Sequence, residues 1–246
     1  MGRAFEYRKA SKFARWDKMA KQFSRVGKEI AMAVKEGGPN PDANLALRRA
    51  IQNAKGVNMP KDNVERAIKK ASGDGAENYE EITYEGYGKG GVSFFIECTT
   101  NNPTRTVANV RAIFNKFEGT LGKNGELSFI FDRKGIFTIE RKFITFNKED
   151  FELEMIDGGA EEIDFDDDEV LITTAFEDFG TMQNKLESLG IEVKNATLQR
   201  LPNVVKQPSL DDAKILMKMM DRFEEDDDVV NVFHNMEISD DVASQL

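Results

Sequence analysis

Cationic side chains at helical spacing are the groups in this sequence most suited to chemistry, because ammonium and guanidinium groups neutralise phosphates and release their counterions. The stretch KGVNMPKDNVERAIKKASG, residues 55–73, has apolar residues at steps of three and four, and it starts near Pro60 and stops at Gly73. This pattern predicts a helix with one buried face. Its outward-facing cations are Lys61, Arg66, Lys69 and Lys70.

Two more predicted helices precede this one and are also cationic. The first follows apolar residues from Phe13 onward and ends at Gly37-Gly38, and the second is opened by Asn40 and Pro41. A single cationic helix face is often only solvated, whereas three in succession favour contact with a phosphate backbone. No turn spacing identifies a recognition helix. The further residues of this predicted nucleic-acid interface are Lys9, Lys12, Arg15, Lys18, Lys21, Arg25, Lys28, Arg48 and Arg49.

Charge is strongly segregated along the chain. Its 246 residues carry a net charge of −10, yet residues 1–78 hold 17 Lys/Arg and 9 Asp/Glu, which is a net charge of +8. Residues 79–134 are neutral, residues 135–202 carry −11 and residues 203–246 carry −7. This segregation indicates that the two ends of the chain face different partners.

Groups typical of enzyme sites are scarce. His234 and Cys98 both fall in predicted strands, where a structural role is the simpler interpretation. No Cys/His metal spacing is present, and the acidic runs DFDDDE and EEDDD lack the alternation and the glycine of a calcium loop. GYGKGG, residues 86–91, precedes a strand and therefore predicts a tight turn rather than a phosphate loop. The sequence predicts a non-enzymatic protein with no cofactor, metal or small-molecule substrate.

A second polar cluster lies at a predicted strand-to-helix junction, in TTNNPTR. Turn and cap chemistry explains two or three of its residues. Arg105 stands in the first helical turn, where a cation opposes the helix dipole, so we expect a partner for it in RNA, in another protein or in the N-terminal helices. The candidate contact residues are Thr100, Asn101, Asn102, Thr104 and Arg105.

The rest of the chain predicts α/β structure. After the polar link SGDGAENYEE, the segments GVSFFIECTT and GELSFIFDR predict strands on either side of a helix opened by Pro103. From GIFTIE onward a complete β-α-β-β-α-β series follows, which is the ferredoxin-like arrangement. The first α/β series, in residues 79–134, stops after strand, helix and strand. A predicted helix and strand in residues 203–246 complete it.

The expected fold class is a multidomain α+β protein, with a basic helical domain followed by two ferredoxin-like α/β domains, the last inserted into the middle one. The predicted domains are residues 1–78, which are basic and helical, residues 79–134 plus 203–246, which form a discontinuous α/β domain, and residues 135–202, which form an acidic insertion.

Three stretches resemble the YebC/PmpR family, which includes a mitochondrial translational activator. They are GGPNPDANLALRRAIQNAKGVNMPKDNVERAIKKASG, YEGYGKGGVSFFIECTTNNPTRTVANVRAIFNKFEGTLG and GELSFIFDRKGIF, and they cover about half the chain in the order and spacing of the family. The resemblance implies three domains, one helical and basic and two α/β. Family members usually begin with GHSKW, whereas this chain begins with GRAFEYRKASKFARW and has Trp16 as the counterpart.

The resemblance implies a DNA-binding transcriptional regulator, although some members look like ribosome-associated translation factors that relieve stalling. The residues themselves favour a nucleic acid partner, DNA or rRNA, without choosing between the two. A protein-interaction module without nucleic acid is the third interpretation. No run of about 18 apolar residues spans a membrane, the N-terminus lacks a secretory apolar core, and Cys98 is the only cysteine, so a cytoplasmic protein is expected.

Overall fold

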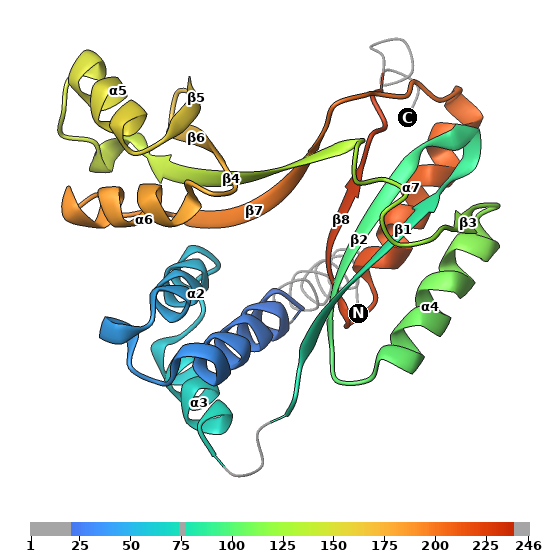
Figure 1. Ribbon diagram of the computed structural model, residues 1–246, viewed down its shortest axis with the longest axis horizontal. Helices are drawn as coiled ribbons and strands as arrows, with labels where there is room; N and C mark the ends of the chain where they lie inside the picture. The colour runs from blue at the N-terminus through green and yellow to red at the C-terminus, as the bar shows by residue number, and fades with distance from the viewer. Residues whose placement is uncertain (1–20, 74–76, 239–246) are drawn as a thin grey trace, which may run out of the picture. The chain divides into compact units, whose positions relative to one another are not determined.

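The structure is a computed structural model that describes residues 21–73 and 77–238. The chain divides into two compact units, Met1–Tyr79 and Glu80–Leu246. The first unit is helical, and the second combines helices with two four-stranded sheets (Figure 1). A helical N-terminal region followed by α/β structure confirms the predicted α+β fold class.

The helical unit packs around a core of small and aliphatic side chains. Ile30, Leu47, Ala50 and Ala54 are fully buried in it, and alanine at two of these positions lets the helix backbones approach closely. Residues 13–20 of the predicted first helix lie outside the described residues. The elements of this unit are a helix over residues 21–37, η1 (Pro41–Ala43), α2 (Leu45–Gly56) and α3 (Lys61–Ala71).

Asn44, and not Asn40, caps α2, which corrects the sequence expectation. Asn40 accepts a hydrogen bond from the Asp42 amide and caps only the short η1. The buried Asn44 side chain accepts from the Leu47 amide at 3.0 Å and donates to the Ala33 and Gly38 carbonyls at 2.7 and 2.9 Å. One amide therefore joins the end of the first helix to the start of α2.

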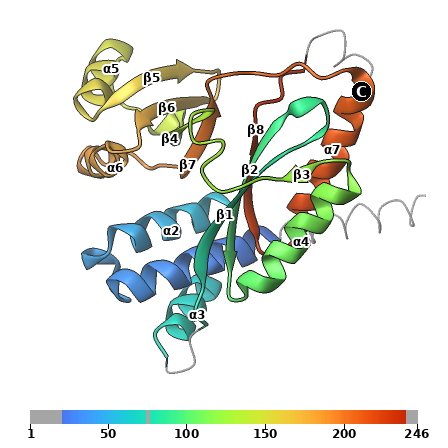
Figure 2. The same ribbon diagram turned by 45° about the vertical axis from the view of Figure 1, so that its right-hand side comes forward.

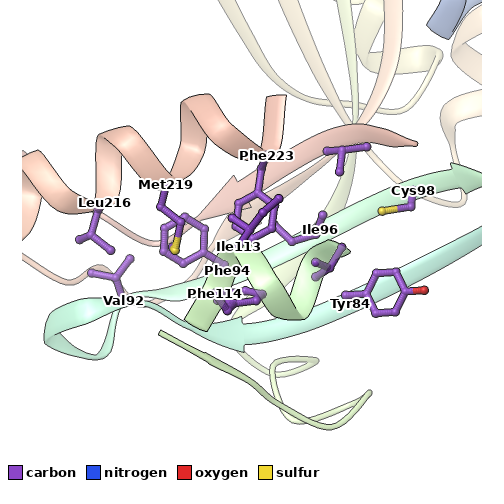
Figure 3. Packing of buried hydrophobic residues seen from close by; sticks show 12 residues of the cluster. Tyr84, Val92, Phe94, Ile96, Cys98, Ile113, Phe114, Leu216, Met219 and Phe223 are labelled. Atoms are coloured by element: carbon purple, nitrogen blue, oxygen red, sulfur yellow. The ribbon is translucent and has the colours of Figure 1, made fainter. Parts of the chain in front are cut away.

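The first sheet has the strand order β3-β1-β2-β8, with every neighbouring pair antiparallel. Helices α4 and α7 cover one of its faces, and Phe94, Phe114 and Phe223 meet edge to face in the core between them (Figure 3). The elements are β1 (Glu80–Tyr87), β2 (Ser93–Thr100), β3 (Thr120–Leu121), β8 (Val229–His234), α4 (Pro103–Lys116) and α7 (Leu210–Glu224).

Glycines in and after β1 serve this packing. A Cβ added at Gly86 would lie 2.6 Å from the Phe114 ring, and one added at Gly88 would lie 2.5 Å from Leu216. The predicted tight turn is confirmed, since Gly90 and Gly91 adopt positive φ angles between β1 and β2. The GYGKGG segment is therefore explained by close packing and a turn.

Two strands of the first sheet differ from the sequence expectation. β1 begins inside the segment that we interpreted as a polar link, and its partly buried Ile82 and buried Tyr84 contact the core. GELSFIFDR is not a strand of this sheet, because residues 124–130 form turns and only its last three residues belong to β4. The third strand is instead the two-residue β3.

A buried carboxylate explains why that segment turns. Glu85 of β1 is only 4% exposed. Its two carboxylate oxygens accept hydrogen bonds from the Gly125 amide at 2.8 Å and the Leu127 amide at 2.6 Å. Backbone N–H groups that a strand would offer to a neighbouring strand are satisfied here by one side chain.

The second sheet has the order β5-β6-β4-β7 with all neighbours antiparallel, which is the ferredoxin-like order. Helices α5 and α6 pack on one face through Phe151, Met155 and Phe179 (Figure 2). β4 starts at Phe131, so it runs across the predicted boundary between the middle and inserted domains, at residues 134 and 135. The limits of the three domains remain a prediction. The elements are β4 (Phe131–Glu140), α5 (Lys148–Asp157), β5 (Ala160–Phe165), β6 (Glu169–Ala175), α6 (Phe179–Ser188) and β7 (Asn195–Pro202).

Arg200 connects the second sheet to the first. Its guanidinium carbon lies 3.8 Å from the centre of the Phe95 ring, and its Nε lies 3.0 Å from a carboxylate oxygen of Glu97. Phe95 also packs with Leu127 and Phe131 in a small apolar cluster. A stacked and paired arginine beside this cluster fixes the path of β7 past β2.

Replacing Glu85 by Ala should lower the free energy of unfolding by about 2–3 kcal/mol, because two backbone amides, one of them buried, lose a charged acceptor. Glu85→Gln keeps one acceptor oxygen and should lose less. Urea unfolding monitored by circular dichroism measures both. Glu126→Ala removes an exposed carboxylate from the same turn and serves as the control, expected to stay within about 0.5 kcal/mol of the parent. Equal losses for the Glu85→Ala and Glu126→Ala variants would contradict the role of Glu85.

Candidate nucleic-acid interface

Helix α3 presents four exposed cations to solvent. Val64 is buried, and Ala67, Ile68 and Ala71 pack partly buried against the core, so the opposite face remains free for charged side chains. Asp62 in the first turn and Lys69 in the last turn both complement the helix dipole. The exposed cations are Lys61, Arg66, Lys69 and Lys70, as the sequence predicted.

Arg66 and Lys69 differ from the other two cations of α3. Lys61 lies 3.6 Å from Glu65 one turn along, and Lys70 lies 2.9 Å from Glu77. The side chains of Arg66 and Lys69 make no ion pair or hydrogen bond with any residue in the ranges 21–73 and 77–238. Two exposed cations three residues apart, without counter-charges, are suited to a phosphate backbone.

The arginines of α2 serve internal contacts. Arg48 Nη1 donates to the Pro41 and Asp42 carbonyls at 2.9 and 3.0 Å and so satisfies the end of η1. Arg49 Nε lies 3.6 Å from Glu29 of the first helix, and both side chains are about 30% exposed. Both arginines are predicted interface residues, yet each already stabilises the helical unit.

The cations of the first helix are only partly exposed. Lys21, Arg25 and Lys28 lie on the helix face opposite the buried Val26 and Ile30, as expected. Each of the three has a contact within the protein. The predicted contacts Lys9, Lys12, Arg15 and Lys18 lie outside the described residues, as does Trp16. Among the described residues of the predicted interface, the cations of α3 are therefore the most exposed.

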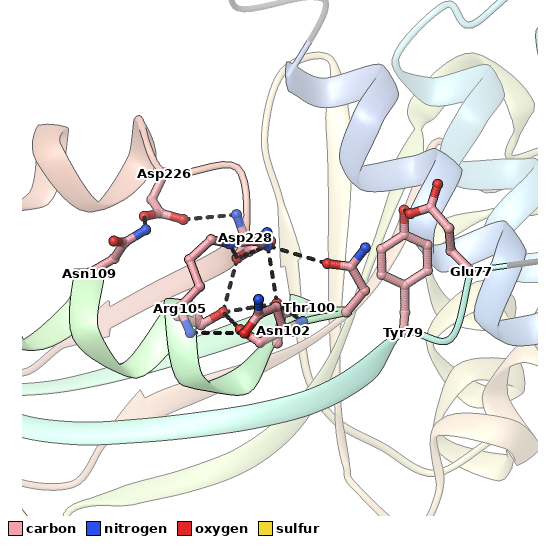
Figure 4. A network of polar contacts seen from close by, with 10 residues as sticks. Glu77, Tyr79, Thr100, Asn102, Arg105, Asn109, Asp226 and Asp228 are labelled. Atoms are coloured by element: carbon pink, nitrogen blue, oxygen red, sulfur yellow. Dashed lines mark hydrogen bonds and ion pairs between the residues drawn. The ribbon is translucent and has the colours of Figure 1, made fainter.

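The second polar cluster is organised around the buried Asp228, which follows α7 (Figure 4). One Asp228 oxygen accepts from Arg105 Nη2 at 2.6 Å, from Arg105 Nε at 3.2 Å and from Thr106 Oγ1 at 2.9 Å. The hydrogen bond to Asp228 raises the pKa of Arg105. The partner that we expected for Arg105 is thus a carboxylate of its own unit, 123 residues away.

The remaining residues of this cluster divide into caps and exposed groups. Asn102 caps α4 by accepting from the Arg105 amide at 3.1 Å. The buried Thr100 Oγ1 accepts from the Asn102 amide at 2.9 Å and lies 2.9 Å from Thr106 Oγ1, to which its own hydroxyl can donate. Asn101 and Thr104 are exposed. A contact of these residues with another molecule stays a prediction, whereas the fold accounts for Thr100 and Asn102.

His234 and Cys98 are both set in the first sheet. Cys98 is 2% exposed. Burial lowers the pKa of His234, whose Nδ1 accepts from the Met236 amide at 3.2 Å and whose ring lies 6.0 Å from that of Phe94. Within the described part of the chain, no group of three His, Cys, Asp or Glu side chains is placed to hold a metal ion.

Among residues 21–73 and 77–238, no helix is both long and apolar enough to cross a bilayer.

Comparisons with known proteins cover almost the whole chain. Residues 3–74 match the family model described as the TACO1/YebC protein N-terminal domain, and residues 79–236 match the TACO1/YebC second and third domain. A protein of Flavobacterium johnsoniae named "Probable transcriptional regulatory protein" is 51% identical over 96% of this chain and 99% of its own. One of Wolinella succinogenes with the same descriptive name is 46% identical over 96% of this chain and 100% of its own.

A solved structure has the same fold. The crystal structure of a conserved hypothetical protein from Aquifex aeolicus superposes with a TM-score of 0.77 at 38% identity, and the match covers 90% of this chain and 91% of that one. The likeness therefore spans both units of the chain.

Asp228→Asn should lower the free energy of unfolding by about 2 kcal/mol, since Arg105 and Thr106 lose a charged acceptor. Asp227→Asn removes the same charge from the exposed neighbouring position and is the matched control. Chemical unfolding of both variants measures the difference. A loss no larger than that of the control would show that the network does not stabilise the fold.

His234 should make stability fall on acidification. Its folded-state pKa lies below the ordinary value, so as pH decreases through about 6.5 the unfolded state binds a proton that the folded state excludes. His234→Gln removes the only histidine of the chain, so the variant should lose less unfolding free energy than the parent between pH 8 and pH 5.5. Urea unfolding at the two pH values measures this difference, and identical pH dependences would refute it.

Proposed function

The chain belongs to the TACO1/YebC family, and from this membership and the cationic surface of α3 we propose that it is a non-enzymatic, nucleic-acid-binding regulator of gene expression that binds DNA in transcription. The curated relatives are named as regulators and not as enzymes. The observation that carries the proposal is the pair Arg66 and Lys69, which are exposed and have no counter-charge among the described residues, in a region of net charge +8. The expected cytoplasmic location belongs to the same proposal.

Contact would be with the phosphate backbone. The solvent face of α3 mixes its cations with the exposed carboxylates Asp62 and Glu65. Such a surface supplies affinity and salt dependence without sequence choice. Target selection would then depend on DNA shape or on a second bound protein.

A ribosome-associated translation factor is the alternative. Residues 135–202 carry −11, which disfavours a long DNA duplex beside them but suits basic ribosomal proteins. Crosslinking in cells followed by sequencing of the attached nucleic acid separates the two. Promoter DNA favours the first function and rRNA the second.

Reversing two charges on α3 tests the interface directly. Arg66→Glu together with Lys69→Glu should weaken binding to a fluorescein-labelled duplex, and the slope of log affinity against log salt should fall by about 2, since each lost phosphate contact removes about 0.9. Fluorescence anisotropy over a salt series measures both quantities. Both positions are exposed, so the fold should be retained.

The matched control reverses two cations on the other unit. Lys214 and Lys218 are exposed on α7 one turn apart, so their change to Glu alters the net charge equally. This variant should keep nearly all of the affinity. Equal weakening by both double variants would mean that only total charge matters, and unchanged binding by both would favour the protein-interaction module.

A further inference from the structure

The helical unit encloses a cavity of about 230 Å³ between the first helix, α3 and residues 77–79. Part of its lining consists of small side chains, among them Gly27 and Ala31. The rest brings together three ammonium groups, one carboxylate and one aromatic ring, which come from Lys28, Lys35, Lys70, Glu77 and Tyr79. These side chains surround one space, so the site is a pocket with a mixed lining and not a flat charged surface.

The residues that follow α3 hold the Tyr79 ring in place. The Tyr79 hydroxyl donates to a Glu77 carboxylate oxygen, and the other Glu77 oxygen accepts from Lys70 Nζ at 2.9 Å. Lys35 Nζ donates to the Asn78 side chain at 2.7 Å, and Lys28 Nζ lies 5.5 Å from the centre of the Tyr79 ring. The negative charge of Glu77 is therefore shared by Lys70 and Tyr79, whereas Lys35 donates to a neutral amide.

These features match one nucleotide better than other ligands. Pockets for drug-sized molecules measure about 300–1,000 Å³, so this cavity suits a smaller and partly polar group. Aromatic side chains stack on single bases, and ammonium groups bind the adjoining phosphate. We propose that the cavity takes one unstacked nucleotide of a single-stranded nucleic acid, with the base against Tyr79 and the phosphate at Lys35. This inference rests on the proposed function, because it names the part of the nucleic acid that the helical unit holds.

Gly27 offers a way to fill the cavity without disturbing the fold. A Cβ added there meets no atom within 4 Å, so a larger side chain has open space to occupy. Gly27 stands within the helix over residues 21–37, where leucine is a better helix former than glycine. Gly27→Leu should therefore fold at least as well as the parent and obstruct the nucleotide.

The test compares two strands on the full-length protein. The probes are a fluorescein-labelled strand of twelve thymidine nucleotides and an abasic strand of the same length, with binding measured by anisotropy. The parent should prefer the thymidine strand by about 5- to 100-fold, which is the usual effect of stacking one base. Gly27→Leu and Tyr79→Leu should abolish this preference, whereas Gly27→Ala and Tyr79→Phe should keep it.

A charge variant checks the phosphate side of the cavity. Lys35→Gln should lower the log–log salt slope by about 0.7 for both strands, as expected for one contact to a single strand. It should leave the preference for the thymidine strand in place. An unchanged slope would remove Lys35 from the proposed phosphate site.

Two results would overturn the proposal, and they are distinguishable from failure of the proposed function. Equal binding of the two strands by the parent, or an intact preference in Gly27→Leu, would refute the nucleotide cavity while leaving phosphate binding in place. Absence of binding to either strand and to a duplex at low salt would refute nucleic-acid binding altogether, and the cavity proposal with it. Thermal melting confirms that each variant is folded, and Gly27→Leu alone decides the outcome if Tyr79→Leu unfolds.

Discussion

The path of the chain from the first sheet to the second depends on one buried carboxylate. Glu85 accepts the amides of Gly125 and Leu127, and this turns the segment that precedes β4. The turn places Leu127 against Phe95 and Phe131. With Phe131 fixed, β4 starts at the residue that pairs with the end of β7, and β7 in turn brings Arg200 onto Phe95. Two sheets with separate cores are thereby connected through charged groups at their junction.

Elements with local start and stop signals could be predicted from the sequence. Asn102, Asn147 and Ser209 are residue types that favour the N-cap position, and each accepts an amide at the start of the helix that follows it. The exceptions have identifiable physical causes. Nothing near residues 125–133 shows that an acceptor 40 residues earlier will satisfy an amide there. β1 begins with two exposed glutamates, Glu80 and Glu81, which look like part of a polar link. The capping role of Asn44 could not be read from the sequence, because its side chain donates to the carbonyls of Ala33 and Gly38, at the end of the preceding helix.

The candidate site was less predictable than the fold, because the fate of a cation is decided by distant partners. Arg48 and Arg66 look alike in the sequence, and both stand in helices. Arg48 finds two backbone carbonyls before its own helix, whereas Arg66 has no partner among the described residues. The expectation of a partner for Arg105 followed from the helix dipole, but only the tertiary structure identifies Asp228. Residue type and spacing therefore predict which faces are charged, and packing decides which charges remain available.

Charge segregation restricts where a polyanion can bind. Exposed charges more than about 8 Å apart are largely screened at physiological salt, so a phosphate senses its immediate neighbours rather than the net charge of the chain. Lys70 gains little from a phosphate, because it already has Glu77 and would exchange one anion for another. Arg66 and Lys69 have no anionic partner among the described residues, so a phosphate would give each of them a new ion pair. The segments of net charge −11 and −7 repel a second stretch of the same strand. An acidic protein can therefore bind nucleic acid through one small unit, and the acidic remainder disfavours attachment elsewhere.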